Sequence, residues 1–292
     1  MARKNTLNVL GLKQFNADSS DFYVNTVSQH LKASHLHINK AHKHDFYASI
    51  LFTAGSGIHE IDFNSYQVKP NSVFLLAPGQ THHWELSEDA EGIIFFHSKD
   101  FYESHYVRDL LSDYTFFSNV QNQGVLYLDQ RMQEEIVPIF NKLLAVTHQD
   151  GFRQKQLLLS LITQIYVQLD NILISDTSVQ PTRHDGYYSA FLKFQRMVEQ
   201  HFLNEKSVSQ YADWMNMTAK HLNRINQTIV SKSTLEIITD RVILEAKRIL
   251  IFGDNNISQV AEQLGYSDYS HFSKIFKNKT GMTPTDFLKQ YH

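Results

Sequence analysis

Two stretches of the sequence repeat each other. Val208-Ser209-Gln210-Tyr211-Ala212-Asp213 is followed by His221-Leu222-Asn223-Arg224-Ile225, and Ile257-Ser258-Gln259-Val260-Ala261-Glu262 is followed by His271-Phe272-Ser273-Lys274-Ile275. The first halves align at an offset of 49 residues and the second halves at 50, so the second copy has one extra residue between its halves. A repeat of this period is one supersecondary unit that the chain uses twice.

Each copy has the pattern of two short helices joined by a turn. In the second copy the inward positions, at helical spacing, are Ile257, Val260, Ala261 and Leu264, then Phe272, Ile275 and Phe276. Between these sets, Gly265 can end the first helix, and Ser267 or Asp268 can cap the second. The pattern predicts a pair of helix-turn-helix units. The segment from Asp240 to Leu250 consists of good helix formers, so one helix is expected to hold the two units at a fixed separation.

The second copy and the residues after it contain a dense set of motifs: Ala261, Leu264-Gly265-Tyr266, Phe272-Ser273-Lys274, Phe276-Lys277, Gly281 and Thr283-Pro284. Through these motifs, residues 207–290 resemble the DNA-binding domain of the AraC family of bacterial transcription regulators. This resemblance implies two helix-turn-helix units on a linker helix, which enter two successive major grooves on one face of the DNA. Three features depart from the family's pattern: Asn226-Gln227 stands for an aromatic-lysine pair, Ser231 for a closing glycine, and Phe287-Leu288-Lys289 lacks the usual arginine.

Side chains near the start of each second helix reach base edges in this geometry. The predicted DNA contacts are Lys220, His221, Asn223 and Arg224 in the first unit and Tyr269, Ser270, His271 and Lys274 in the second, with Lys277 as a phosphate contact. Arginine and lysine suit guanine, and asparagine suits adenine. The alternative for each residue is a solvated surface position, and for the two histidines it is also a hydrogen bond within the unit.

Charge is distributed unevenly along the chain. The 292 residues have a formal net charge of −3; residues 1–183 hold 14 Lys and Arg against 19 Asp and Glu, giving −5, and residues 184–292 hold 13 against 11, giving +2. The basic part coincides with the predicted DNA-binding units. The absence of cysteine excludes disulfides and thiolate metal sites. No stretch approaches the length of a membrane span and no signal-peptide pattern opens the sequence, so a cytoplasmic protein is expected.

Residues 36–100 contain short strands separated by turns. The strand patterns are 48–53, 58–63, 72–76 and 93–96, with turns at Ala54-Gly55-Ser56-Gly57 and Ala77-Pro78-Gly79. Such spacing predicts a β-sandwich or barrel. The stretch from His42 to His82 resembles the cupin barrel that many AraC-family members carry as a sensor.

Histidines of this region match metal positions of cupin enzymes, which use two close histidines, a glutamate and a later histidine. The histidine positions are His42, His44 and His82, but the glutamate position falls at Ala48 or Ser49. Because a ligand is missing, we expect no metal and no other cofactor, and we assign these histidines to a pocket or to strand ends. The other histidines of the strands are interpreted as surface or satisfied residues: His59, His83 and His97.

An effector site is predicted at the mouth of the barrel, near His44, Tyr47, His82 and Trp84. Aromatic faces with imidazole and hydroxyl groups suit a polar, carbohydrate-like small molecule. No cluster of arginines accompanies them, which disfavours a phosphorylated ligand. The alternative is that Tyr47 and Trp84 belong to the barrel core.

Helical patterns begin after residue 100. One helix is expected from Arg131, with a break near Pro138. Residues 156–167 are apolar around most of a helix, which must therefore be buried on more than one side. This helix either packs against its own barrel or forms an interface with a second copy, and we expect a symmetric dimer held by residues 131–172.

The sequence thus predicts an α+β protein of two domains, joined by a polar linker at 175–186. Residues 1–100 form a cupin-like β-barrel or jelly roll, residues 101–182 a helical dimerisation segment with the linker, and residues 183–292 an all-α domain with two helix-turn-helix units. The predicted function is a non-enzymatic, sequence-specific transcription regulator with three kinds of partner: double-stranded DNA, a small-molecule effector and a second copy, with RNA polymerase as a further one. Two alternatives remain, a cupin enzyme with a DNA-targeting tail and a regulator whose barrel serves only for dimerisation.

Overall fold

The computed structural model describes residues 9–15, 21–38, 41–105, 111–117, 124–147, 152–176, 185–252 and 255–291; for 34–38, 174–176, 185, 252 and 291 it describes the backbone only. The chain divides into two compact units, a β-rich unit within residues 8–178 and a helical unit within residues 179–292. Most of the predicted linker lies outside the described residues. Among the helices that the structure describes, none is both long enough and apolar enough to cross a bilayer.

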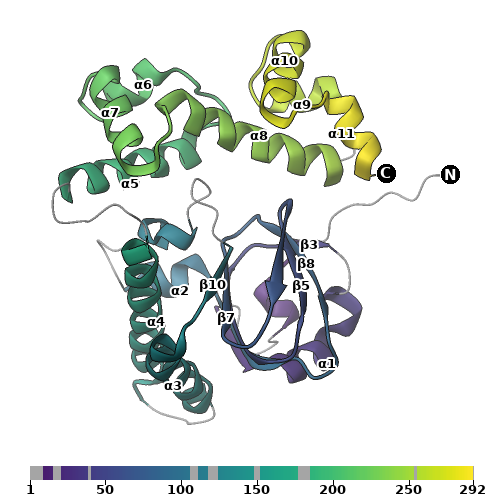
Figure 1. The fold of residues 1–292 in the computed structure, drawn as a ribbon, viewed down its shortest axis with the longest axis vertical. Coiled ribbons are helices and arrows are strands. Elements are labelled where there is room, and N and C mark those ends of the chain that lie inside the picture. Colours follow the sequence, from purple (N-terminus) through teal and green to yellow (C-terminus); the bar gives the residue numbers. More distant parts are fainter. Residues whose placement is uncertain are drawn as a thin grey trace. The chain divides into compact units, whose positions relative to one another are not determined.

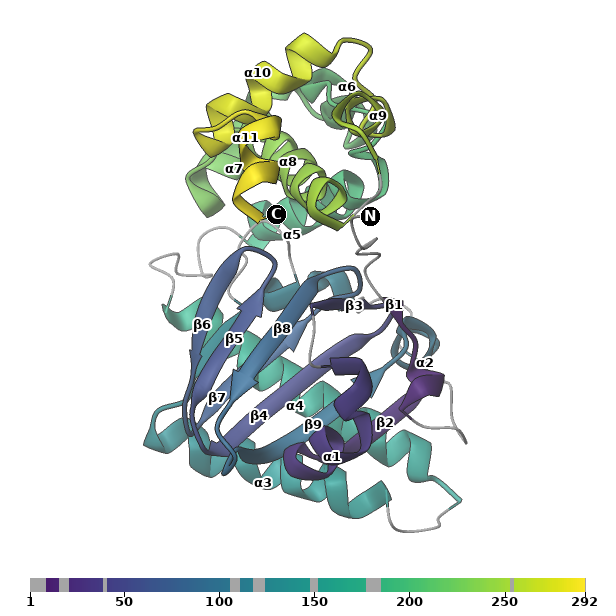
Figure 2. The same cartoon turned by 90° about the vertical axis from the view of Figure 1, so that its right-hand side faces the viewer.

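The β-rich unit is a sandwich of two five-stranded sheets (Figures 1 and 2). The first sheet has the order β1 (Val9–Leu10), β3 (His42–His44), β8 (Thr81–Leu86), β5 (Gly57–Ile61), β6 (Asn64–Val68). The second has the order β10 (Val125–Tyr127), β7 (Ser72–Leu76), β4 (Tyr47–Ala54), β9 (Glu91–His97), β2 (Phe22–Thr26). All four predicted strands are present, and the described strands form two facing sheets instead of one closed barrel.

Strand β4 shows how the unit is layered. Successive side chains of a strand point to opposite faces. Ala48, Ile50 and Phe52 therefore face the interior of the sandwich, where they join Phe74, Trp84 and Phe96 in one apolar cluster. Tyr47 and Leu51 face the other way and belong to a second cluster that also contains helical residues. Both faces of β4 are consequently buried.

Two helices cover the outer face of the second sheet, α3 (Gln130–Thr147) and α4 (Gln154–Asp176), as Figure 1 shows. The apolar face of α4 packs on its own domain: Leu158 is 5% exposed and Ile162 is fully buried. These two side chains therefore pack within their own domain and are unavailable to a partner, whereas the dimer expected through residues 131–172 stays a prediction for other side chains of that range. The predicted break at Pro138 is wrong, because Pro138 lies inside α3.

A short polar chain crosses the apolar interface between α4 and the sheet. The Tyr166 hydroxyl of α4 lies 2.7 Å from His97 Nε2 and 3.1 Å from Ser49 Oγ, and His97 Nδ1 lies 2.9 Å from the Ser98 carbonyl oxygen. A carbonyl cannot donate, so Nδ1 carries the proton and Nε2 accepts from Tyr166, which accepts from Ser49. Burial lowers the pKa of His97 to about 4, and burial raises the pKa of Tyr166 well above its usual value.

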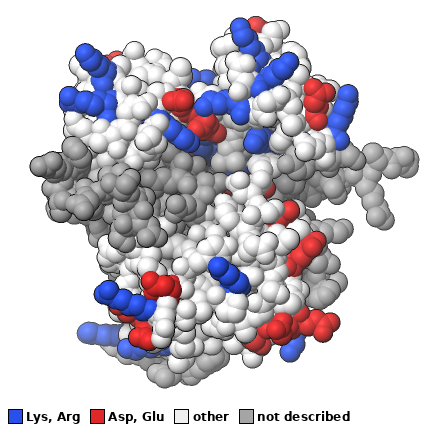
Figure 3. Space-filling view, in the orientation of Figure 1, with Lys and Arg blue, Asp and Glu red and all other residues white. Residues whose placement is uncertain are grey.

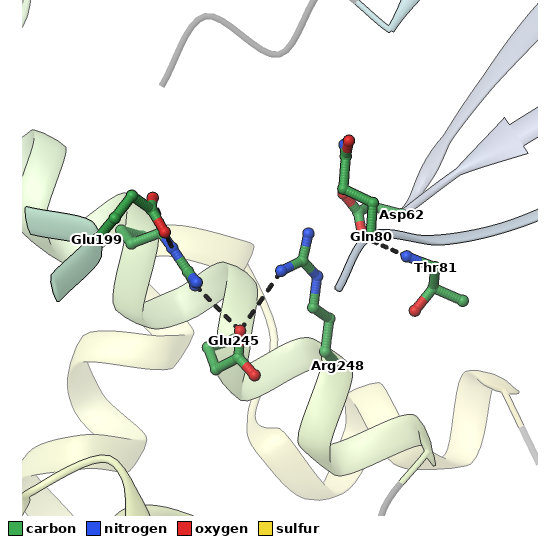
Figure 4. A network of polar contacts seen from close by, with 7 residues as sticks. Asp62, Gln80, Thr81, Glu199, Glu245 and Arg248 are labelled. Carbon is green, nitrogen blue, oxygen red and sulfur yellow. Dashed lines mark hydrogen bonds and ion pairs between the residues drawn. The ribbon is translucent and has the colours of Figure 1, made fainter. Parts of the chain in front are cut away.

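The remaining helices of the β-rich unit are short or lie beside the strands. Helix α1 (Val27–Ile38) contacts β2 and β9, and α2 (Lys99–Glu103) follows β9 (Figure 2). The turn after β5 is held by Asp62, whose carboxylate accepts hydrogen bonds from the Thr81 backbone N–H and from the Gln80 amide, both at 3.2 Å (Figure 4).

The helical unit is built around one long helix, α8 (Thr234–Phe252), which contains the predicted central helix. The others are α5 (Asp185–His201), α6 (Val208–Trp214), α7 (Ala219–Val230), α9 (Ile257–Gln263), α10 (Tyr269–Thr280) and α11 (Pro284–Tyr291). Helix α8 contacts α5, α7, α9, α10 and α11. Its buried Arg241 bonds Glu199 at 2.9 Å and Glu245 at 3.0 Å, and Glu245 also bonds Arg248 (Figure 4). Apolar packing and this ion-pair network thus join α8 to α5.

Candidate nucleic-acid interface and histidine cluster

The first helix-turn-helix unit consists of α6, its turn and α7. Ser207 caps α6 by accepting the backbone N–H of Gln210, and Thr218 caps α7 by accepting that of His221. Asn216 takes a left-handed conformation in the turn, with φ of 53°. The shared core of the two helices contains Tyr211, Ala212, Met215, Leu222, Ile225 and Ile229. The unit is therefore defined by both its caps and its core.

The second unit, α9 and α10, has the same plan with different residues. Asn256 caps α9 in a reciprocal capping box with Gln259, and Asp268, one of the two residues that the sequence offers as caps, caps α10. Gly265 takes the left-handed turn position with φ of 75°. Its core contains Val260, Ala261, Leu264, Phe272 and Phe276. The repeat inferred from sequence is therefore a repeat of structure.

Most of the predicted DNA-contacting side chains lie on the outward faces of α7 and α10. Seven of them are exposed: Lys220, Arg224, Tyr269, Ser270, His271, Lys274 and Lys277. His221 and Asn223 are only partly exposed. Lys and Arg side chains also project from the helical unit on the face drawn in Figure 3. The outward faces of α7 and α10 thus offer cationic and polar groups to a polyanion.

Arg224 has a defined position before any ligand is bound. Its Nη2 lies 2.8 Å from His221 Nδ1, and its guanidinium lies 5.7 Å from the centre of the Tyr187 ring. Guanidinium nitrogens only donate, so Nδ1 is the acceptor and the His221 proton sits on Nε2. The alternative considered for His221, a hydrogen bond within the unit, is therefore present. His271 instead lies beside the Tyr266 ring, with 5.8 Å between the ring centres.

Asn223 has a structural role that its sequence position does not reveal. Its Oδ1 accepts the backbone N–H of Thr234 at 3.0 Å, at the start of α8. An asparagine that reads adenine uses both its amide oxygen and its amide nitrogen. That bidentate contact is incompatible with the bond to Thr234, so the prediction of Asn223 as an adenine reader is not supported by this geometry.

A second group of functional residues is a cluster of buried histidines inside the sandwich. His82 Nε2 lies 3.0 Å from His44 Nε2, and His82 Nδ1 lies 2.8 Å from His59 Nε2. His42 completes the group, with its ring centre 4.4 Å from that of His82. His42 and His82 are paired residues on the neighbouring strands β3 and β8, and His44 follows His42 on the same face of β3.

The imidazoles of His44, His59 and His82 are neutral in the folded protein. Burial lowers the pKa of His59 to about 3, and the pKa values of His44 and His82 also fall well below the usual range because of burial and neighbouring histidines. Each neutral ring has one N–H and one lone pair. The cluster therefore contains several lone pairs that no proton occupies.

The structure brings together only part of the predicted effector site. His44, His82 and Trp84 share the sandwich interior, with Trp84 only 8% exposed. Tyr47 does not join them: it stacks on His97, with 5.5 Å between ring centres, on the helix-covered side of β4. The prediction for Tyr47 is wrong because Tyr47 and His44 lie on different sheets. His59, which the sequence assigns to surface or satisfied strand positions, is a fully buried strand residue with a hydrogen-bond partner: its Nε2 lies 2.8 Å from His82 Nδ1.

Comparisons with known proteins match both units. Residues 30–97 match the family model of the AraC-like ligand binding domain, and residues 211–290 match that of a helix-turn-helix domain. Helix-turn-helix transcriptional activator RhaS of Pectobacterium atrosepticum is 24% identical over 253 residues, 85% of this chain and 87% of the relative. The arabinose operon regulatory protein of Salmonella typhimurium is 21% identical over 80% of each chain.

Among solved structures, ToxT from Vibrio cholerae with a bound unsaturated fatty acid aligns with 92% of this chain and 95% of its own, at 15% identity and a TM-score of 0.42. The matched ligand-binding domain lies in the β-rich unit, and the matched helix-turn-helix domain that follows it lies in the helical unit with the two paired-helix motifs. The chain is a DNA-binding transcription regulator and belongs to the AraC family.

Proposed function

We propose that α7 and α10 insert into successive major grooves of one DNA site and that a ligand in the β-rich unit controls this binding. The observation that carries the proposal is the pair of capped helix-turn-helix units, each with a cationic outward face, on the single helix α8. In such units the second helix presents side chains near its N-terminus to base edges.

In this proposal the residues have different roles. Lys220, Arg224, Tyr269, Ser270, His271 and Lys274 contact bases or phosphates, and Lys277 contacts phosphate. His221 acts through Arg224, because its Nδ1 accepts from that guanidinium. Asn223 acts through the start of α8, because it accepts the Thr234 N–H. The functional surface is thus supported by two residues that hold it in position.

The experiment is DNA binding by the full-length protein to sites selected from a pool of genomic fragments. Affinity should fall by orders of magnitude between low and moderate salt, because cationic side chains release counterions from the phosphates. Arg224→Ala and Lys274→Ala should each cost about 1–3 kcal/mol on the specific site if they contact bases.

Lys193→Ala is the matched control, since Lys193 is an exposed lysine on α5, outside both recognition helices. Equal losses on specific and non-specific DNA would restrict Arg224 and Lys274 to phosphate contacts. Salt-independent binding, or full affinity in both variants, would contradict the proposed interface.

For the β-rich unit we propose a small-molecule site at His44, His82 and Trp84, now without Tyr47. A polar or carbohydrate-like effector suits imidazole and indole groups, and one of the relatives is the regulatory protein of a sugar operon. His44→Gln and His82→Gln should abolish effector-dependent transcription while leaving DNA binding by the helical unit intact. Unchanged effector dependence in both would place the site elsewhere.

We also propose a homodimer through the outward face of α4. The apolar residues exposed there are Leu157, 40% exposed, and Val167, 44% exposed. A double Leu157→Glu, Val167→Glu variant should sediment as a monomer while remaining folded, because neither side chain belongs to the core. Glutamates at Gln29 on α1 and Gln67 on β6, two exposed positions of the same unit outside α4, are the control. We place the protein in the cytoplasm, where bacterial DNA and RNA polymerase, the further proposed partner, are found.

A further inference from the structure

The histidine cluster has the geometry of a metal site. One ring nitrogen from each of His42, His44 and His82 lies within 4.8 Å of the others. In the part of the chain that the structure describes, no other group of His, Asp or Glu meets this criterion. All three side chains are less than 5% exposed and come from two neighbouring strands, so their positions are set by the sheet and not by mobile loops.

The spacing of two nitrogens matches shared coordination. Nitrogen ligands at 2.0–2.1 Å from a tetrahedral ion are about 3.3 Å apart. His44 Nε2 and His82 Nε2 are 3.0 Å apart. Without an ion, this distance requires one of the two nitrogens to carry the proton of a hydrogen bond. An ion would take the place of that shared proton, which would move to an Nδ1 atom or to solvent, with the nitrogens separating by only a few tenths of an ångström.

His59 is placed to orient a ligand. Its Nε2 lies 2.8 Å from His82 Nδ1. When His82 Nδ1 donates to His59, the lone pair of His82 lies on Nε2, the atom that faces His44. Metal-binding histidines usually have such a partner for the second ring nitrogen, because it fixes the tautomer and the ring orientation. His59 therefore supports the site from outside the ligand set.

We propose that His42, His44 and His82 bind a divalent transition-metal ion of the Zn²⁺ class inside the sandwich, with His59 as the positioning residue. Three imidazole nitrogens favour Zn²⁺, Co²⁺, Ni²⁺ or Cu²⁺ over Mg²⁺ or Ca²⁺, which prefer oxygen ligands. A three-histidine site leaves a fourth position for water or for an oxygen atom of a small molecule. The inference deepens the proposed function, because it names the chemical class of the ligand that the β-rich unit holds.

The test uses full-length protein freed of metal with a chelator and then titrated with Co²⁺ or Zn²⁺. We expect one equivalent of Zn²⁺ per chain by elemental analysis after desalting, and a Co²⁺ complex with the strong visible absorption of tetrahedral coordination. His44→Gln and His82→Gln should each weaken binding at least 100-fold, and His59→Gln about 10- to 100-fold. His30→Gln is the control, because His30 is buried next to Trp84 but lies outside the ligand set.

Two results would overturn the proposal independently of any variant: less than one tight equivalent in the wild-type protein, or a weak octahedral Co²⁺ spectrum. Equal binding by wild type and the two ligand variants would also overturn it, because the chain has 16 histidines that can take up metal elsewhere. DNA binding is measured in parallel with and without Zn²⁺. If the wild-type protein takes up no metal but binds DNA, the metal site alone is refuted, and if it takes up metal but binds no DNA, the DNA interface alone is refuted.

Discussion

The two helix-turn-helix units have the same plan but close their second helices by different chemistry. In the first unit the helix after α7 begins at Thr234, whose N–H is accepted by Asn223 and whose hydroxyl accepts from the buried Asn226 amide at 2.9 Å. In the second unit the matching position is Pro284, which has no N–H. Phe276 replaces Asn226 there and packs against Phe287, with 5.4 Å between ring centres. One unit uses polar bonds where the other uses aromatic packing.

This difference shows that the geometry of the repeat is preserved although its interactions are not. A backbone N–H at a helix start needs an acceptor when it is buried, and proline removes that need. Once the N–H is absent, the asparagine pair of the first unit has no equivalent function in the second. Ser273, which takes the position of Asn223 in the second unit, therefore has no backbone N–H to accept from at the matching position, Pro284.

The largest expected difference between the units concerns Asn226 of α7 and Phe276 of α10, which are equivalent positions. Phe276→Ala should destabilise the helical unit by about 3–5 kcal/mol, because it removes a fully buried ring. Asn226→Ala should cost about 1–3 kcal/mol, through the lost bond to Thr234. Chemical denaturation of the full-length protein, followed by the helical signal, measures both. A larger loss for Asn226→Ala would reverse the assignment of polar and aromatic closure.

Turn glycine Gly265 gives the next largest effect. A Cβ on Gly265 would lie 2.3 Å from the Leu203 carbonyl oxygen, and its φ of 75° disfavours side chains. Gly265→Ala should therefore destabilise the unit by about 2–3 kcal/mol. Asn216→Gly, at the equivalent left-handed position of the first unit, should change stability by less than about 1 kcal/mol. Thermal unfolding separates the two, and a neutral Gly265→Ala would show that the turn can relax.

A smaller difference in stability is expected between alanine substitutions at Asn223 and at Ser273, which are equivalent positions of α7 and α10. Asn223→Ala leaves the Thr234 N–H without its acceptor and should cost about 1 kcal/mol. Ser273→Ala should be close to neutral, since Pro284 offers no N–H. Far-ultraviolet melting curves measure both changes. A comparable cost in the two variants would argue that Ser273 has a bonding role of its own.

The smallest effects are expected where each recognition helix ends. Ser231 and Gly281 both take the left-handed conformation, with φ of 54° and 81°. Glycine adopts it without strain, so Ser231→Gly should stabilise the protein by about 0.5–1 kcal/mol and Gly281→Ala should destabilise it by about 1 kcal/mol. No atom outside the adjacent residues lies within 4 Å of a Cβ at Gly281, so only the backbone term contributes there. Opposite signs in the melting temperatures confirm the comparison, and equal signs contradict it.

Local patterns predicted much of this structure. The apolar spacing and caps of the repeat indicate α9 and α10, and the cap of α10, expected at Ser267 or Asp268, is Asp268. Long-range pairing was the part that the sequence could not supply. Tyr47 was placed with His44 because the two are near in sequence, whereas the chain passes from one sheet to the other between them. A proline inside a helical pattern predicts a break, but the packing of α3 on the sheet keeps the helix continuous through Pro138.

The histidine cluster also depends on long-range contacts that the sequence does not show. His42 and His44 share a strand face at period two, which is visible in the sequence. The inward face of β5 is not visible, because burial of His59 depends on the facing sheet. The bond between Asn223 and Thr234 is likewise not visible in the sequence, because it spans 11 residues and depends on the angle between α7 and α8. Sequence position alone therefore suggests a DNA contact for Asn223.

The chain of hydroxyl and imidazole groups between Ser49, Tyr166 and His97 limits how α4 can move. An apolar helix face alone can slide along a sheet, since one set of methyl contacts replaces another. Axial displacement of α4 would separate the Tyr166 hydroxyl from both partners and leave three polar groups in apolar surroundings, at about 1–3 kcal/mol for each. Helix α4 therefore has one position along its axis, and a displacement of β4 or β9 displaces α4 with it.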